Sequence, residues 1–316
     1  MQAVVTSASR KLPLLRAIAD QLQQVAPGAS VVATDADPRC VAAFAWEPFV
    51  AFPRLDDVAP QTVVDAVSSI GPELLVPTRD ADVLFFAEHH EDLSARGTWC
   101  LAGTETAVAR CLDKLAFAVA LVDAGVAVIP TVLDPSATGS DRVVVKERHG
   151  AGSRGLSLDL APGAATVAAE ALAEPVFQPF VAGPEVSIDA YRARDGRLLG
   201  MVVRSRDVVV GGESQVTTTV DPQPYQELTE SALTALGLTG HAVLQAIDGP
   251  DGPVLVECNP RLGGASTLSL ASGLRSAAWA WLEAVGRDPD ELPFVPEPPG
   301  LRLVRTAHDE IRRVGA

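Results

Sequence analysis

The stretch Leu255-Val256-Glu257-Cys258-Asn259-Pro260-Arg261-Leu262-Gly263-Gly264 forms the second strand of a predicted hairpin and the loop after it. The turn-forming segment 248–252 joins this strand to an apolar one that carries Gln245. Side chains two positions apart share one face of a strand, so Glu257 and Asn259 point the same way. A carboxylate with two amide oxygens suits magnesium carried by a nucleotide, because Mg²⁺ keeps waters and takes its other ligands from phosphates.

The competing interpretation is a hairpin whose solvent face happens to be polar, because E-x-N-P-R is a short motif. Lysine usage favours a phosphate site: of 25 basic residues only Lys11, Lys114 and Lys146 are lysines. A lysine ammonium serves phosphate as a compact point charge, whereas arginine needs room for its planar fork. Three lysines in an arginine-rich chain can also be an accident of composition.

Composition limits the partners of the chain. Its 316 residues predict two or three subdomains, and a hydrophobic content of 47% is ample for their cores. A formal net charge of −15 argues against nucleic acid and anionic membrane surfaces, which attract basic patches. The four scattered cysteines support neither a zinc site nor a disulfide framework. No signal sequence or membrane-spanning run is predicted, so we expect a cytoplasmic protein.

The first hundred residues alternate strands and helices, which predicts an open parallel sheet. The loop after the first strand lacks the G-x-G-x-x-G fingerprint, so a dinucleotide site and an oxidoreductase are disfavoured. Gly103 closes this predicted domain. The predicted strands are 3–6, 31–34, 74–76 and 98–101, and the predicted helices are 11–25 and 61–70, followed by one through Leu84 and Phe85.

Arg79 and Asp80 follow the predicted strand 74–76 directly. Ligands gather at the carboxyl ends of strands in open α/β sheets, which makes both residues candidates for substrate contact. The alternative is helix capping, with Thr78 or Asp80 as the N-cap of the next helix. One residue can serve both purposes.

A glycine-rich loop follows a predicted strand that ends in Lys146. The loop, His149-Gly150-Ala151-Gly152-Ser153-Arg154-Gly155, leads into another strand at 156–160, and its glycines would let backbone N–H groups close over phosphates. An ordinary tight hairpin is the alternative. Before it, the segment 104–124 predicts a single helix with Leu112, Leu115, Val119 and Val122 on its buried face.

An apolar strand at 176–181 is interrupted by Pro179, so it cannot pair fully, and its free backbone groups could meet an adenine edge. Glu185 comes shortly after it. The remaining chain predicts an antiparallel sheet, with a hairpin turn at Asp195-Gly196. Its predicted strands are 186–194, 197–203, 207–210 and 215–220, its predicted helices are 225–236 and 266–285, and the last residues suggest a short strand and tail.

Together these residues resemble the ATP-grasp superfamily, most closely the synthetase domain of the large chain of carbamoyl phosphate synthetase and related carboxylate–amine ligases. The resemblance implies an N-terminal parallel α/β domain, called the pre-ATP-grasp domain, followed by an ATP-grasp fold with a small lid and an antiparallel-sheet subdomain. The implied bounds are 1–103 for the first domain, 104–300 for the second with its lid at about 115–175, and 301–316 for the tail.

The resemblance also implies roles for single residues. Two departures from the family pattern are Glu147, where proline is common, and Gln178, where glutamate is usual. The implied catalytic residues are Lys146 and Arg261; the nucleotide contacts are Lys114, Lys146, Gly152, Ser153, Gly155, Gln178, Phe180, Val181 and Glu185; the metal ligands are Gln245, Glu257 and Asn259; and the substrate contacts are Arg79, Asp80 and Arg204.

The implied reaction uses ATP and one or two Mg²⁺ ions to activate a small-molecule or amino-acid carboxylate as an acyl phosphate. An amine then displaces phosphate to form an amide. The alternatives are a kinase that stops at the phosphorylated product and a nucleotide-binding module without chemistry. Arg204 or Arg206 could clamp the substrate, and a solvated position is expected for Arg206. A homodimer is the default assembly.

Overall fold

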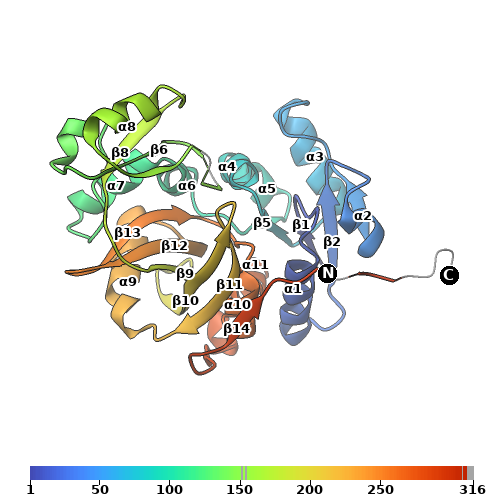
Figure 1. Ribbon diagram of the computed structural model, residues 1–316. Helices are drawn as coiled ribbons and strands as arrows, with labels where there is room; N and C mark the ends of the chain where they lie inside the picture. The colour runs from blue at the N-terminus through green and yellow to red at the C-terminus, as the bar shows by residue number, and fades with distance from the viewer. Residues whose placement is uncertain (151, 154, 308, 312–316) are drawn as a thin grey trace.

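The computed structural model describes residues 1–150, 152–153, 155–307 and 309–311. Strands in this part of the chain form a parallel sheet, a three-stranded sheet and a six-stranded sheet (Figure 1). A parallel α/β unit followed by antiparallel sheets is the predicted fold class, which is confirmed. Among the described residues, no helix is long and apolar enough to cross a membrane.

The N-terminal sheet has the strand order β3-β2-β1-β4-β5, and all its pairs are parallel. Its order reverses between β1 and β4, so the loops that follow these two strands meet at one edge, where ligands commonly bind. Strand β3 has only three residues and was not predicted from the sequence. The strands are β1 Gln2–Val5, β2 Ser30–Asp35, β3 Phe49–Ala51, β4 Leu74–Val76 and β5 Trp99–Cys100; the helices are α1 Leu12–Val25, α2 Val41–Ala45, α3 Pro60–Ile70, α4 Asp80–Glu88 and α5 His90–Ala95.

The lid predicted at about 115–175 contains a small antiparallel sheet of order β7-β6-β8. Every second valine of β6 faces a compact core that includes Val143, Val145 and Phe177. The lid lies over the six-stranded sheet in Figure 1. Its elements are α7 Lys114–Asp123, the 3-10 helix η1 Pro135–Thr138, β6 Val143–Glu147, β7 Ser157–Leu160, α8 Pro162–Ala169 and β8 Pro175–Pro179.

The six-stranded sheet has the order β13-β12-β9-β10-β11-β14 and is antiparallel throughout. Residues 207–210, predicted as a separate strand, continue β10 without interruption. The strands are β9 Glu185–Arg192, β10 Leu198–Val210, β11 Glu213–Val220, β12 Gly240–Gly249, β13 Gly252–Asn259 and β14 Arg302–Val304; the 3-10 helices η2 Gln223–Tyr225 and η3 Pro289–Glu291 and the helix α9 Gln226–Leu236 accompany them.

The prediction of one helix over 104–124 is wrong. The chain forms α6 Glu105–Leu112 and α7 Lys114–Asp123, with Asp113 between them in an extended conformation. The Asp113 carboxylate accepts hydrogen bonds from the N–H groups of Leu115 and Ala116 and so caps α7. Because the second helix restarts there, its buried face changes, and Val119 and Val122 are exposed.

The predicted helix at 266–285 is also two helices, α10 Ser266–Ala271 and α11 Ser276–Ala284. Gly273 between them has a φ of 101°, a conformation that L side chains rarely adopt. The second helix is buried on every side, and both helices pack against α1. The C-terminal part of the chain therefore shares a core with the N-terminal sheet.

Neither Thr78 nor Asp80 is the N-cap of α4. That position is occupied by Arg79, whose side chain makes no capping hydrogen bond. The Thr78 hydroxyl donates instead to the Thr6 carbonyl and accepts from Lys11 Nζ at 2.6 Å. The division of the chain at Gly103 stays a prediction, since one hydrophobic cluster contains residues from both sides of it.

Candidate active site

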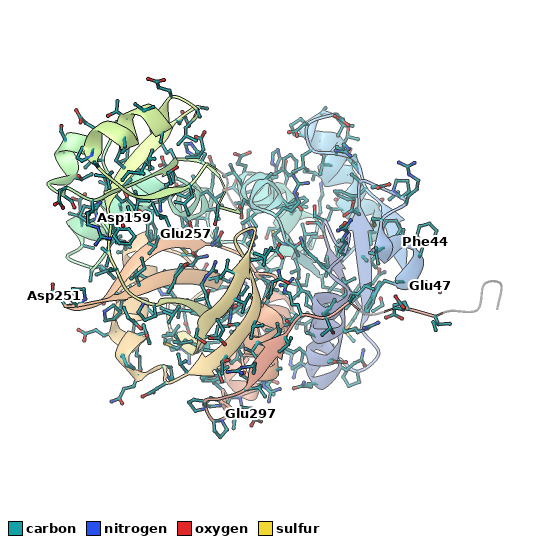
Figure 2. All side chains as sticks on the ribbon, viewed as in Figure 1. Phe44, Glu47, Asp159, Asp251, Glu257 and Glu297 are labelled. Atoms are coloured by element: carbon teal, nitrogen blue, oxygen red, sulfur yellow. The ribbon has the colours of Figure 1, made fainter. Side chains whose placement is uncertain are left out.

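A cavity of about 970 Å³ lies between the lid and the six-stranded sheet. Figure 2 shows Glu257 where these two parts face each other. Of the residues predicted for the site, Arg79, Asp80 and Gly155 do not border the cavity. Those that border it are Lys114, Lys146, Gly152, Ser153, Gln178, Phe180, Val181, Glu185, Arg204, Gln245, Glu257, Asn259 and Arg261. Two members of the glycine-rich loop, Ala151 and Arg154, lie outside the described residues.

Strand pairing brings the predicted oxygen donors together on the floor of the cavity. Gln245 on β12 is directly opposite Glu257 on β13, and Asn259 lies one pleat further along the same face. The Asn259 amide nitrogen approaches Glu257 Oε1 at 3.4 Å. These donors are hard oxygens, which fit Mg²⁺ that takes most of its ligands from phosphates and water. The described residues contain no group of three or more His, Cys, Asp or Glu side chains that could hold a metal.

Two lysines enter the cavity from the lid side. Lys146 extends from β6 and Lys114 from the start of α7, and both side chains are buried. Apart from Lys11, they are the only lysines in the sequence. Lys114 Nζ donates to the Gly150 carbonyl at 2.8 Å, which ties it to the glycine-rich loop. Burial lowers the pKa of Lys146 to about 8; Glu257 raises it, whereas Lys114 lowers it further. A cavity with two desolvated ammonium groups attracts a polyanion.

We predict that affinity for Mg·ADP falls about tenfold between pH 7 and pH 9, because only about a tenth of Lys146 carries a proton one pH unit above its pKa. Below pH 8 the ammonium is charged and attracts phosphate, and above pH 8 this attraction is lost. Calorimetric titration at the two pH values measures the change, and at pH 9 binding should also take up a proton. In the variant Lys146→Arg, whose charge persists, the affinities should agree within about twofold. The same tenfold loss in that variant would contradict the assignment to Lys146.

The opposite end of the cavity is formed by the end of β8. Gln178 is buried, and its amide nitrogen donates to the Thr131 hydroxyl at 2.8 Å, which leaves its oxygen as an acceptor. The Phe180 N–H donates to the Arg142 carbonyl, and the Arg142 guanidinium stacks on the Phe180 ring at 4.4 Å. The residues at this end are thus fixed in position by contacts within the lid.

The expectation that Arg206 is solvated is wrong. Its side chain is only 9% exposed, because it borders the cavity and pairs with Glu185, with Nε 3.2 Å from Oε1. A terminal amino group of Arg206 also donates to the Gly212 carbonyl at 3.0 Å. Burial raises the pKa of Glu185, an effect that Arg206 opposes. Arg204 and Arg206 are two positions apart on β10, so strand periodicity predicts that the two side chains share a face.

Arg261 connects the cavity with the N-terminal sheet. Its Nε donates to Asp80 Oδ1 at 2.5 Å, which brings the loop after β4 to the edge of the site. The half-buried Lys11 has its pKa lowered to about 8, first by desolvation and then by Arg261. Arg79 is exposed on the same loop. Asp80 therefore acts on the cavity through Arg261, although it does not border it.

Arg305 borders the cavity and is not among the site residues predicted from the sequence. It follows β14 and lies so close to Gly264 that a Cβ atom at position 264 would meet its guanidinium at 2.4 Å. A side chain at position 264 would therefore displace the Arg305 guanidinium from this place. Arg305 Nη1 also lies 3.3 Å from Glu213. No local motif marks Arg305, because its place depends on the pairing of β14 with β11.

Comparisons with known proteins agree with this architecture. Residues 172–307 match the model of a family described as "ATP-grasp in the biosynthetic pathway with Ter operon". Biotin carboxylase from Campylobacter jejuni is 14% identical with a TM-score of 0.71, over 92% of this chain and 73% of that one. N5-carboxyaminoimidazole synthetase from Staphylococcus aureus, solved with ADP, is 15% identical with a TM-score of 0.71, over 95% and 79%. An L-amino acid ligase from Bacillus licheniformis is 17% identical with a TM-score of 0.67, over 93% and 77%. No curated protein matches the chain.

Proposed function

We propose that the chain is an ATP-dependent ligase of the ATP-grasp superfamily, which its motifs predicted and with which the matched family model and the fold agree. It would activate the carboxylate of a small molecule or amino acid and couple it to an amine, releasing ADP and phosphate. One observation carries the proposal: two buried lysines and a set of oxygen donors border the same cavity from opposite sides. The matched family is described as part of a biosynthetic pathway, which agrees with a ligase that builds a small product.

ATP would lie with its base at the end of β8 and its phosphates between Lys146 and the β12–β13 hairpin. Since the Phe180 N–H is already bonded to Arg142, adenine would pair with the Phe180 carbonyl and the Val181 N–H, and its amino group with the Gln178 oxygen. Glu185 would accept from the ribose hydroxyls. Gly152 and Ser153 border the phosphate region from the lid.

Gln245, Glu257 and Asn259 would hold one or two Mg²⁺ ions. Bound magnesium supplies charge neutralisation to the phosphate oxygens and orients them. The remaining work belongs to side chains, because phosphoryl transfer depends chiefly on positioning and electrostatic stabilisation. Lys146 and Arg261 would face the transferred phosphoryl group from the two sides of the cavity.

The reaction would proceed in two steps. A carboxylate oxygen of the acid attacks the γ-phosphorus of ATP, the bond to the bridging oxygen of ADP breaks, and an acyl phosphate forms. The nitrogen of the amine then attacks the acyl carbon and loses a proton, and inorganic phosphate leaves. Enclosure between lid and sheet would protect the acyl phosphate from water. The small-molecule partners are thus an acid and an amine, and a dimeric, cytoplasmic protein remains a prediction.

Hydroxylamine trapping tests the reaction class. We expect a panel of small acids, supplied with ATP, Mg²⁺ and hydroxylamine, to contain at least one that yields a hydroxamate together with equal ADP. Hydroxylamine intercepts an acyl phosphate but not a phosphate ester. ADP release with an acid-derived phosphate ester and no hydroxamate would indicate a kinase, and Mg·ADP binding without any turnover would indicate a binding module. Either result would contradict the ligase, and reactions without acid control for ATP hydrolysis.

A further inference from the structure

A carboxylate that the proposed reaction leaves without a role lies beneath the floor of the cavity. Asp189 on β9 has no exposed surface. Its Oδ2 accepts from Arg204 Nε at 2.7 Å, its Oδ1 accepts from the Ser266 hydroxyl, and His241 Nε2 lies 3.4 Å from Oδ1. One buried charge thus joins β10, α10 and β12. Burial opposes its ionisation, but Arg204, His241 and Ser266 hold the pKa of Asp189 well below its usual range.

The first arm of this network orients Arg204. Its side chain is 3% exposed and borders the cavity, and the pairing with Asp189 uses Nε. In the part of the chain that the structure describes, no hydrogen bond or ion pair occupies the two terminal amino groups. A guanidinium held by its Nε presents a planar pair of donors, the arrangement that binds a carboxylate bidentately.

The second arm fixes the turn after Arg261. The Ser266 hydroxyl donates to Asp189 and accepts from the Gly263 N–H at 2.8 Å. Ser266 is fully buried, and Gly263 borders the cavity two residues after Arg261. The same carboxylate therefore supports both Arg204 and the loop that carries Arg261.

The strand register gives the distance between the two ends of the cavity floor. Glu257 is opposite Gln245, Gln245 is opposite Ser187, and Ser187 is opposite Arg204. Three strand spacings separate the backbones of Glu257 and Arg204, which is about 14 Å. Asp189, which holds the Arg204 guanidinium, lies on β9, between β10 and the β12–β13 hairpin. Two strand spacings, about 10 Å, separate the backbone of β9 from that of β13. An anion on Arg204 therefore lies well away from one that reacts beside the Glu257 donors.

We propose that Arg204, positioned by Asp189, binds a second anionic group of the acid substrate, so that the substrate class is small acids with two anionic groups. The inference rests on the proposed function, because it assigns the acid to the same cavity. Asp189 is a positioning residue: it acts on the substrate through Arg204 and on the phosphoryl group through the loop of Arg261.

Matched acids test the substrate class. Glutarate and butyrate, succinate and propionate, and glutamate and 2-aminobutyrate differ within each pair by one carboxylate. With a non-hydrolysable ATP analogue and Mg²⁺ bound, calorimetry should show at least one diacid binding tenfold or more tighter than its partner. Equal affinities within every pair, or no binding by any of the six acids, would overturn the inference. Failure of the wild type to bind the analogue would instead contradict the proposed function.

Variants test the positioning role. Asp189→Asn and Arg204→Gln should each reduce the diacid preference at least tenfold and leave Mg·ADP affinity within about twofold, and Arg204→Lys should restore part of the preference. Ser266→Ala keeps the Arg204 arm, so it should retain the preference and lower kcat with the preferred acid. Asp207→Asn, on the same strand as Arg204 but hydrogen-bonded to Ser205 and Thr218, is the matched control without effect. If Asp189→Asn unfolds, Arg204→Gln and Ser266→Ala decide; a diacid preference unchanged in Arg204→Gln would overturn the proposal.

Discussion

Glu257→Ala is expected to lower ATP turnover by about 10³-fold or more and to leave the fold intact. The carboxylate is the one charged oxygen donor of the predicted metal set, so its loss weakens Mg²⁺ binding. The bound metal contributes several kcal/mol to stabilising the charge on the phosphates in the transition state. The half-buried Glu257 forms no ion pair in the described part of the chain and accepts one weak hydrogen bond, from the Asn259 amide, so we expect the fold to tolerate its removal. Steady-state ADP release, measured over a range of Mg²⁺ concentrations, gives the effect.

Asp251→Ala is the matched control for this change. Asp251 is an exposed acid at the turn of the same hairpin, and Figure 2 shows it far from Glu257. This control should keep wild-type turnover and the same melting temperature. Unchanged ATP consumption in Glu257→Ala would refute the metal assignment. A large loss of turnover in Asp251→Ala would show that the Glu257→Ala effect comes from a destabilised hairpin and not from a lost metal ligand.

Arg261→Ala is expected to lower kcat by about 10³-fold, the range in which an arginine beside a transferring phosphoryl group acts. Mg·ADP affinity should change less than about threefold, because the guanidinium would act on charge that develops only in the transition state. Single-turnover ADP formation and calorimetry separate the two effects. Arg261→Lys should recover part of the rate, since it keeps the charge but not the planar fork.

Two further variants identify the cause of an Arg261 effect. Arg302→Ala removes an exposed arginine from β14 and should keep the wild-type rate. Asp80→Asn weakens the ion pair that holds Arg261 and should cost less than Arg261→Ala. If Arg261→Ala weakens nucleotide binding as much as it lowers the rate, the residue binds ATP in the ground state, and its transition-state role is refuted.

The amino-acid sequence determined the local arrangement of the site. Strand periodicity alone predicted that Glu257 and Asn259 share a face, and turn residues predicted the hairpin that brings Gln245 opposite. Arg204 and Arg206 fall in the gap between the predicted strands 197–203 and 207–210, so periodicity did not pair them, although one continuous strand contains both. The resemblance to the ATP-grasp superfamily could also be recognised in the sequence, because the motifs occur in order over a long stretch.

Contacts between distant segments were decided only in the tertiary structure. The helix break at Asp113 depends on the carboxylate that caps α7 and pairs with Arg148, 35 residues away. The Asp80–Arg261 ion pair joins residues 181 positions apart. Hydrophobic periodicity and secondary-structure propensity predict on which face of its own helix or strand a side chain lies. Whether a charged side chain is buried depends on its partners in other elements. For that reason the sequence defined the β12–β13 hairpin, whereas Asp189 and Arg305 acquired their places only when the sheet was assembled.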